Sequence, residues 1–216
     1  MTHLKREASP KRWPTERKGT TYIVGANFNV KNGVPVLIVL RDMLKLVQNR
    51  KEAKSAIHSR NILLNEKIVK DEKNNMLFFD TLGIIPSKKY YRLELSDKGK
   101  FYLNEINEKD ASTKISKIVN KKILNGKKTQ LNLSDGRNFL SDMKCNMNDS
   151  VVVNLKTGKI ERCLPLKEKS NIIVFAGKHA GSKGQIESIN VEEKMAKIRT
   201  EGKEINILIK QLMVTE

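Results

Sequence analysis

Positively charged side chains recur between residues 36 and 69 at spacings that suit the binding of phosphate groups. Apolar positions with helical periodicity run beside them in this stretch, VLIVLRDMLKLVQNRKEAKSAIHSRNILLNEKIV. The cations are Arg41, Arg50, Lys51, Lys54, Arg60 and Lys67. Guanidinium and ammonium groups form charge-assisted hydrogen bonds with phosphate oxygens, so the pattern favours binding to a folded nucleic acid. An ordinary basic helical hairpin with solvated lysines is the alternative interpretation.

Two short helices and a hairpin are expected to position these cations. The apolar stripe over residues 36–47 predicts the first helix. Asn49 and Glu52 have the spacing of a capping box, which predicts that the second helix begins just after Asn49. Apolar residues within 62–69 surround a turn at Asn65–Glu66 and predict two short strands.

This arrangement resembles the αL module, an RNA-binding unit named after the bacterial ribosomal protein S-four. The residues that carry the resemblance are Leu40-Arg41-Asp42-x-Leu44, Arg50-x-Glu52-Ala53-Lys54-x-x-Ile57 and the hairpin. The resemblance implies that the helix pair and the hairpin dock on folded RNA, with the six cations as phosphate contacts. Asn61 and Glu66 depart from the family, which usually has glycine at both positions.

Composition indicates a polyanionic partner for the whole chain. The 216 residues carry a formal net charge of +18, and each Lys or Arg placed on a phosphate displaces condensed counterions. The cations are spread along the chain, as expected of a protein that contacts RNA through several modules. Aromatic residues make up only 5%, so we expect recognition of backbone and shape with little base stacking.

Several other classes of protein are disfavoured. No apolar run is long enough to span a bilayer, and the N-terminus lacks an apolar signal core, so we expect a soluble cytoplasmic protein with no membrane partner. Cys145 and Cys163 are too few for a disulfide framework or a zinc site. His3, His58 and His179 lie beside no nucleophile or ligand set. We therefore expect no catalytic residue, no metal and no cofactor.

Residues 1–35 are expected to form a basic arm and the segment that leads into the first helix. Pro10 and Pro14 disfavour a regular helix, and we expect the arm to become ordered on contact with its partner. Trp13 could stack on a base or fill a crevice in the partner, or it could pack against its own domain. The predicted contact residues in the arm are Lys5, Arg6, Lys11, Arg12, Trp13, Arg17 and Lys18.

Residues 86–168 are expected to form a mostly antiparallel β domain, because alternation with a period of two replaces the helical spacing. Asn125–Gly126 is the strongest hairpin signal, and Asp135–Gly136 predicts another turn. Six lysines and no acid occur between Ala111 and Ser134: Lys114, Lys117, Lys121, Lys122, Lys127 and Lys128. Such a row repels itself unless an anion lies nearby, so all six are predicted RNA contacts.

Residues 169–216 contain a strand, a loop with three glycines, and a second strand. The glycines are Gly177, Gly181 and Gly184, and their spacing is not that of a Walker loop. The pattern resembles a KOW motif, which belongs to a small SH3-like β-barrel whose loop touches RNA or protein. That role carries over to Lys178, His179 and Lys183. Gly184 is expected to need a backbone conformation closed to other residues.

The order of these parts resembles the archaeal and eukaryotic small-subunit ribosomal protein family S-four-e over nearly the whole chain. The residues that carry the resemblance are His3-Leu4-Lys5-Arg6 with Pro10-Lys11-x-Trp13, Leu40-Arg41-Asp42-x-Leu44, Tyr90-Tyr91-Arg92, Val119-Asn120-Lys121, Gln130-Leu131-Asn132-Leu133-x-Asp135-Gly136-Arg137-Asn138, and Gly177-Lys178-His179-x-Gly181. The resemblance adds Arg137 to the predicted contacts, and the length is closer to the archaeal form.

The resemblance implies an α+β protein with an αL-type module at 36–85, a mostly antiparallel β domain at 86–168 and a C-terminal KOW barrel at 169–216. It also implies a structural protein of the small ribosomal subunit, with ribosomal RNA and neighbouring ribosomal proteins as partners. Pseudouridine synthases also carry αL modules, but their catalytic Asp lies in a separate, larger domain for which this chain has no room. A free RNA-binding factor in ribosome assembly or transcription is the alternative left open.

Overall fold

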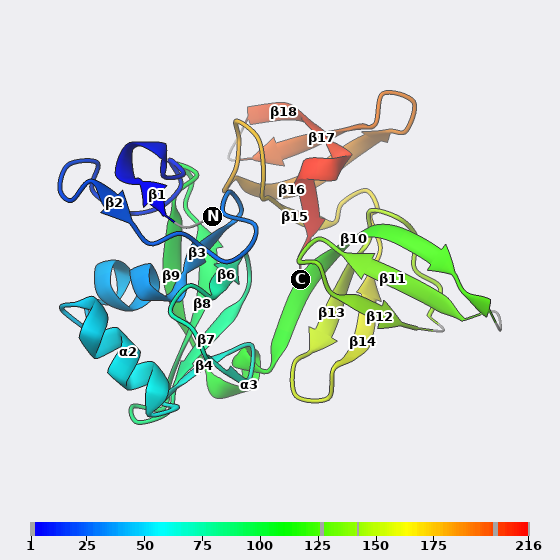
Figure 1. Cartoon of the computed structure of the whole chain (residues 1–216). Helices are drawn as coiled ribbons and strands as arrows, with labels where there is room; N and C mark the ends of the chain where they lie inside the picture. Colours follow the sequence, from blue (N-terminus) through cyan, green and yellow to red (C-terminus); the bar gives the residue numbers. More distant parts are fainter. Residues whose placement is uncertain (1–2, 126–127, 142, 201–202, 216) are drawn as a thin grey trace. The chain divides into compact units, whose positions relative to one another are not determined.

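The computed structural model describes residues 3–125, 128–141, 143–200 and 203–215 (Figure 1). The predicted contact Lys127 and the hairpin residue Gly126 lie outside these ranges. Strands predominate and the helices are short, so the fold class is α+β, as predicted. The chain divides into two compact units, residues 1–95 with 100–112 and residues 96–99 with 113–216.

A five-stranded antiparallel sheet forms the centre of the first unit, with strand order β5-β4-β7-β8-β9. Its strands are β4 (Ile62–Leu64), β5 (Lys67–Ile68), β7 (Thr81–Ile84), β8 (Lys89–Leu95) and β9 (Phe101–Ile106). A two-stranded sheet joins β3 (Gly33–Pro35) to β6 (Asn75–Leu77), and the short helix α3 spans Glu108–Ala111. The strands β8 and β9 were expected in the central β domain, so the predicted boundary at residue 86 is wrong.

The predicted helix pair is present, with a shorter first helix. Helix α1 (Val36–Ile38) continues as the π-helical segment η2 (Val39–Met43), and α2 spans Arg50–His58. The first helix ends before residue 47 because Lys45 adopts a left-handed conformation with a φ of 54°. At the start of α2, the Asn49 side chain accepts a hydrogen bond from the Glu52 backbone N–H at 3.0 Å. Glu52 reaches back to the Gln48 backbone N–H, one residue earlier than a standard capping box.

The turn between β4 and β5 lies at Asn65–Glu66, as predicted. Both residues have positive φ, 52° and 62°, which is typical of the type I′ turn that suits the twist of a hairpin. Asn65 is buried, and its side chain donates to Asp80 and accepts from the Thr81 backbone N–H. These two hydrogen bonds hold the turn in place although glycine is missing from it.

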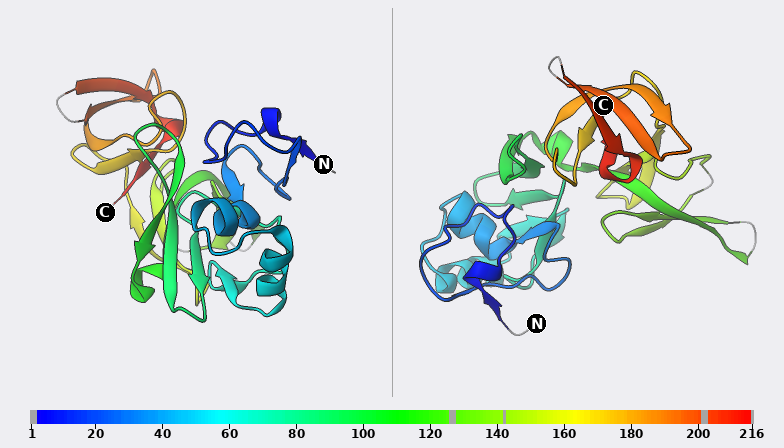
Figure 2. Two further views of the ribbon diagram at one scale, coloured as in Figure 1. Left: turned by 90° about the vertical axis from the view of Figure 1, so that its left-hand side faces the viewer. Right: turned by 90° about the horizontal axis from the view of Figure 1, so that it is seen from above.

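The N-terminal segment packs on its own unit. Strand β1 (Leu4–Lys5) pairs with β2 (Tyr22–Ile23), and the 3-10 turn η1 spans Arg6–Ala8. In both views of Figure 2 this segment (dark blue) runs beside the first helix (lighter blue). Trp13 is 2% exposed, and its indole N–H donates to the Gly33 carbonyl at 2.7 Å. Trp13 therefore cannot stack on a base in this structure, which corrects its assignment as an RNA contact.

Two five-stranded antiparallel sheets form the second unit (Figure 1). The first has strand order β12-β11-β10-β13-β14, with β10 (Thr113–Ile123), β11 (Thr129–Leu133), β12 (Asn138–Leu140), β13 (Ser150–Asn154) and β14 (Lys159–Leu164). The second has strand order β18-β17-β16-β15-β19, with β15 (Asn171–Val174), β16 (Lys183–Asn190), β17 (Met195–Thr200), β18 (Lys203–Leu208) and β19 (Leu212–Val214). The turn η4 (Ile209–Gln211) precedes β19.

Each sheet of the second unit has its own apolar core, and hydrogen bonds connect the two sheets. The first core includes Ile118, Leu131 and Val151, and the second includes Ile172 and Ile198. The Val214 backbone N–H donates to the buried hydroxyl of Ser150 at 2.9 Å. The predicted central β domain and C-terminal barrel are therefore packed as one compact unit.

Candidate nucleic-acid interface

Several exposed cations of the first unit lie on α2 and on the loop and hairpin that follow it. Lys51, Arg60 and Lys67 are exposed. Arg60 has a positive φ of 58° just after α2, which places it at the helix end. These three side chains are open to solvent, and their assignment as phosphate contacts stays a prediction.

Two further cations of this helix are ion-paired. Arg50 and Lys54 both contact the carboxylate of Glu72, which is 3% exposed. The Arg50 Nε–H donates to Glu72 at 2.7 Å, and the Lys54 ammonium lies 3.8 Å away from the same carboxylate. About half of each basic side chain remains exposed. The pairing therefore orients these cations while it neutralises part of their charge.

Arg41 is paired with its chain neighbour Asp42. Its Nε and Nη2 groups donate to the two carboxylate oxygens at 3.0 and 2.9 Å. The hydrogen bond to Asp42 raises the pKa of Arg41, and the charge of Asp42 adds to it, while burial acts in the opposite direction. Arg41 is therefore a fixed guanidinium with one face already occupied.

The basic residues of the N-terminal segment divide into free and structural ones. Lys5, Lys11, Arg17 and Lys18 are exposed. Arg6 is half-buried and donates to the carbonyls of Thr20 and Glu16 at 2.7 and 2.9 Å and to the Thr20 hydroxyl at 2.8 Å. Arg12 is half-buried, and burial lowers its pKa.

Two lysines of β10 are buried, which corrects their assignment as RNA contacts. Lys114 is 3% exposed and forms an ion pair with Asp135 at 2.8 Å. Lys117 is 2% exposed and donates to the carbonyls of Ile209 and Leu212. Neither side chain can reach a phosphate on a partner.

Asp135 explains why a lysine can lie in the interior of this sheet. Burial raises the pKa of its carboxyl group, but the charge and hydrogen bond of Lys114 and the backbone N–H and charge of Arg137 outweigh burial and leave the pKa below its usual value. Arg137 is partly exposed and lies 3.9 Å from Asp135. The sequence analysis missed Asp135 as a partner because an Asp-Gly pair is typical of a turn.

The remaining described lysines of the row are exposed. Lys121, Lys122 and Lys128 lie on β10 and beside β11, and the Lys121 ammonium donates to the Cys145 carbonyl at 3.1 Å. Lys122 and Lys128 are the lysines of this hairpin best placed for a polyanion.

The loop between β15 and β16 presents the cations expected there. Lys178 and Lys183 are exposed, and His179 is half-exposed. Positive φ occurs at Gly177 and Gly181, 90° and 100°, and Gly184 is absent from the positive-φ glycines. Gly184 is needed for a different reason than predicted: a Cβ atom there would lie 2.3 Å from the Arg199 carbonyl oxygen.

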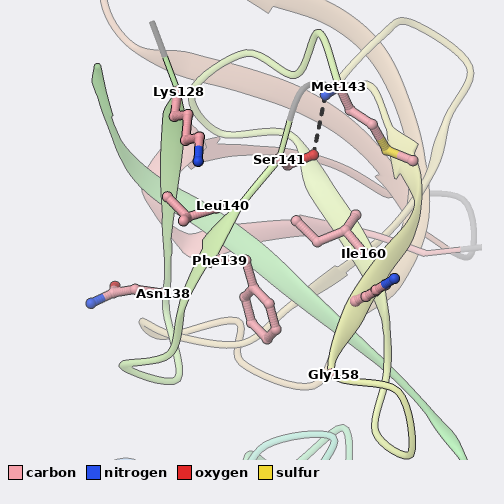
Figure 3. A pocket seen from close by; sticks show the side chains of 9 residues that line it. Lys128, Asn138, Phe139, Leu140, Ser141, Met143, Gly158 and Ile160 are labelled. Atoms are coloured by element: carbon pink, nitrogen blue, oxygen red, sulfur yellow. Dashed lines mark hydrogen bonds between the residues drawn. The ribbon is translucent and has the colours of Figure 1, made fainter. Parts of the chain in front are cut away.

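A wide hollow of about 900 Å³ lies beside β12 and β14 (Figure 3). Its apolar side chains come from Phe139, Leu140, Met143 and Ile160, and Lys128 also lines it.

The two cysteines, Cys145 and Cys163, form no disulfide bond, and burial raises the pKa of the Cys163 thiol to about 12. A thiol with so high a pKa stays protonated and is a poor nucleophile at neutral pH.

The described part of the chain shows neither a metal-binding cluster nor a membrane-spanning helix. No group of three or more His, Cys, Asp or Glu side chains is placed there to hold a metal ion. None of the helices described combines the length and the apolar character needed to cross a membrane.

Comparison with known proteins identifies the family. The sequence profile described as "Ribosomal family S4e" matches residues 87–160. A "Small ribosomal subunit protein eS4" from Methanocella arvoryzae is 37% identical over 193 residues, which cover 88% of this chain and 81% of that protein. The protein of the same name from Haloarcula marismortui is also 37% identical, with 88% and 82% covered.

A solved structure agrees with these relatives. The crystal structure of the 30S ribosomal protein S4e from Thermoplasma acidophilum superimposes with a TM-score of 0.73 at 25% identity, covering 85% of this chain and 95% of that one. The profile and the structural neighbour carry the name S4e and the archaeal relatives the name eS4, and both correspond to the S-four-e family that the order of motifs resembles. The chain belongs to the ribosomal protein family S4e.

Proposed function

We propose that this chain is a structural constituent of the small ribosomal subunit, where it binds and stabilises folded ribosomal RNA through cationic contacts from several modules. Its family consists of ribosomal proteins and not of enzymes, and its relatives are named as small-subunit proteins. The observation that carries the proposal is the distribution of exposed cations. Those among the predicted contacts lie on the N-terminal segment, on α2 and its hairpin, on β10–β11 and on the β15–β16 loop.

The module assignments support this proposal. We assign the capped helix α2 and the hairpin that follows it to an αL module, and the glycine loop between β15 and β16 to a KOW motif, because their elements follow in the expected order. Folded RNA brings phosphates close together, and cations held on rigid scaffolds offset the repulsion more locally than free ions do. Double-stranded RNA is recognised mainly by shape, which suits contacts from several rigid modules.

Neighbouring ribosomal proteins are the second class of partner that we propose. The hollow beside β12 and β14 has exposed apolar residues, Leu140 and Met143, on a strongly basic chain. Exposed apolar side chains in a hollow can pack against those of a neighbouring protein, since burial of apolar surface favours association. The ribosome in the cytoplasm is accordingly the proposed location.

Sedimentation of the tagged full-length chain through sucrose gradients tests this function. We expect the chain to migrate with mature small subunits and to remain there at moderate salt, because many phosphate contacts act together. Migration with immature particles alone would show a free assembly factor instead. Migration at the top of the gradient, away from all particles, would contradict both functions.

A further inference from the structure

A cavity of about 250 Å³ in the first unit is lined by basic side chains and contains no carboxylate in its wall. Its lining residues come partly from the N-terminal segment and the first helix, which run side by side in Figure 2. The basic residues in its wall are His3, Arg6, Arg41, Arg50 and Lys73. We infer that this cavity binds a single phosphate group. The inference rests on the proposed function for the source of that group, the backbone of ribosomal RNA.

Arg6 supplies a positive charge that no carboxylate offsets. Its three described hydrogen bonds end on two carbonyl oxygens and one hydroxyl, all of them neutral. A guanidinium has five N–H donors, so two remain for a ligand. The hydrogen bonds also fix the side chain before any ligand arrives, which lowers the entropy cost of binding.

Two arginines of the cavity wall are held by carboxylates that are not part of it. Asp42 binds Arg41 through Nε and Nη2, and Glu72 binds Arg50. Each ion pair occupies one edge of the guanidinium group, so the remaining N–H donors in the cavity wall are held in a fixed orientation. A concave site walled by one sign of charge concentrates its field on an ion of the opposite sign.

Lys73 adds a positive charge, and its ammonium group forms no ion pair with a carboxylate in the described part of the chain. Its backbone is held in place, since its N–H donates to the Asp71 carboxylate and its carbonyl accepts from the Asn27 N–H. The side chain is half-buried in the cavity wall. Three carboxylates next to the cavity, Asp42, Asp71 and Glu72, are thus outnumbered by the four permanent cations in its wall.

The size of the cavity selects the ligand. Small-molecule sites measure about 300–1,000 Å³, so 250 Å³ suits a phosphate group with its water better than a whole nucleotide. The backbone of Gly25 also lines the cavity, and it has no side chain to block the approach of an anion.

Lys73→Gln is the informative variant, because the structural hydrogen bonds at this position come from the backbone. Lys70→Gln is its matched control: Lys70 lies three residues earlier, is exposed and is absent from the cavity wall. Arg6→Gln is a less useful variant, since it removes three hydrogen bonds that hold the N-terminal segment.

The first experiment titrates the full-length protein with inorganic phosphate at constant ionic strength and follows NMR resonances of the Arg6 Nε–H and the Gly25 amide. We expect saturable shifts in the wild type and in Lys70→Gln, and a loss of affinity of about ten- to hundredfold in Lys73→Gln, the effect of one charge-assisted contact. Shifts that do not saturate, or that are equal in the two variants, would overturn the inference.

The second experiment adds a structured fragment of small-subunit ribosomal RNA to the phosphate-loaded protein, with RNA binding measured separately by fluorescence anisotropy. Reversal of the phosphate shifts supports an RNA phosphate as the occupant. Shifts that persist while RNA binds elsewhere would overturn the RNA source and leave a site for free phosphate. RNA that fails to bind the chain at all would contradict the proposed function, and the phosphate titration would then decide on the cavity alone.

Discussion

The side-chain nitrogen of Lys117, on β10, lies 2.8 Å from the carbonyl oxygen of Leu212, at the start of β19. The same nitrogen donates to the carbonyl of Ile209. Strands β10 and β19 belong to different sheets of the second unit. A lysine that the sequence places in a row of RNA contacts therefore connects two sheets.

Lys117→Met should lower the stability of the second unit. The substitution keeps most of the side-chain volume but removes the Lys117 donor from the buried Leu212 carbonyl, at a cost of about 1–3 kcal/mol. The Ile209 carbonyl loses one of two donors, since it also accepts the Leu212 backbone N–H. Lys122→Met, on the same strand, removes an exposed lysine and should change stability by about 0.5 kcal/mol or less. Urea unfolding measures both free energies, and equal losses in the two variants would contradict the buried contact.

The stability that Lys117 contributes should rise with pH. Burial lowers the pKa of its amine from 10.5 to about 8 in the folded chain. Between these values the unfolded chain binds more protons than the folded one, and stability from this group rises as the pH increases. From pH 7 to pH 9.5 the wild type should gain about 2 kcal/mol relative to Lys117→Met. A constant difference between the two proteins across this range would argue against the lowered pKa.

Asp135→Asn should destabilise the second unit more than a surface substitution does. It removes the Asp135 carboxylate from the Lys114 ammonium, which is 3% exposed, and removing one partner of a buried pair costs about 3–5 kcal/mol. The pKa of Asp135 is lowered on folding, so the contribution of the carboxylate is present above its unfolded pKa and is lost as the pH falls through the folded value.

Replacing both partners provides the control for this pair. Lys114→Met combined with Asp135→Leu removes both charges at once, and unfolding in urea at pH 7 should show that the double variant recovers most of the loss. If Asp135→Asn unfolds at the same urea concentration as the wild type, the ion pair contributes nothing.

Signals confined to a few neighbouring residues predicted local structure well. Asn49 caps α2 because its side chain and the Glu52 N–H are only three residues apart. The turn at Asn65–Glu66 follows from the short apolar runs on either side. Both features depend on contacts within one element, which a linear pattern contains.

Features that depend on distant partners were not predictable in this way. Lys114 can be buried because it forms an ion pair with Asp135, and Lys117 because it donates to carbonyls of η4 and β19. The spacing of residues within β10 does not reveal these partners. Trp13 is similar, since its acceptor is the carbonyl of Gly33, twenty residues away. A single sequence gives the composition of a strand but not the chemistry of the surface that it meets.

Arg50 and Lys51 are adjacent cations with different expected roles. Arg50→Gln should destabilise the first unit by about 1–3 kcal/mol, because it removes the closest donors to the buried Glu72 carboxylate. Lys51→Gln, at an exposed position, should leave stability within about 0.5 kcal/mol. Thermal unfolding of the two variants checks this difference, and a larger loss in Lys51→Gln would show that the assignment is reversed.

The salt dependence of RNA binding tests the central claim that exposed cations contact ribosomal RNA phosphates. The variant Lys51→Gln, Lys122→Gln, Lys128→Gln removes three exposed, predicted contacts. A control variant, Lys156→Gln, Lys167→Gln, Lys169→Gln, removes the same charge from exposed positions outside the predicted set. Both are compared with the wild type in binding to a structured fragment of small-subunit ribosomal RNA.

The quantity to measure is the slope of log binding constant against log salt concentration. Each phosphate contact contributes about 0.7–0.9 to this slope, so the first variant should flatten it by about 2–3. The control should leave the slope close to that of the wild type. Equal slopes for all three proteins, or an equal change in both variants, would contradict the claim.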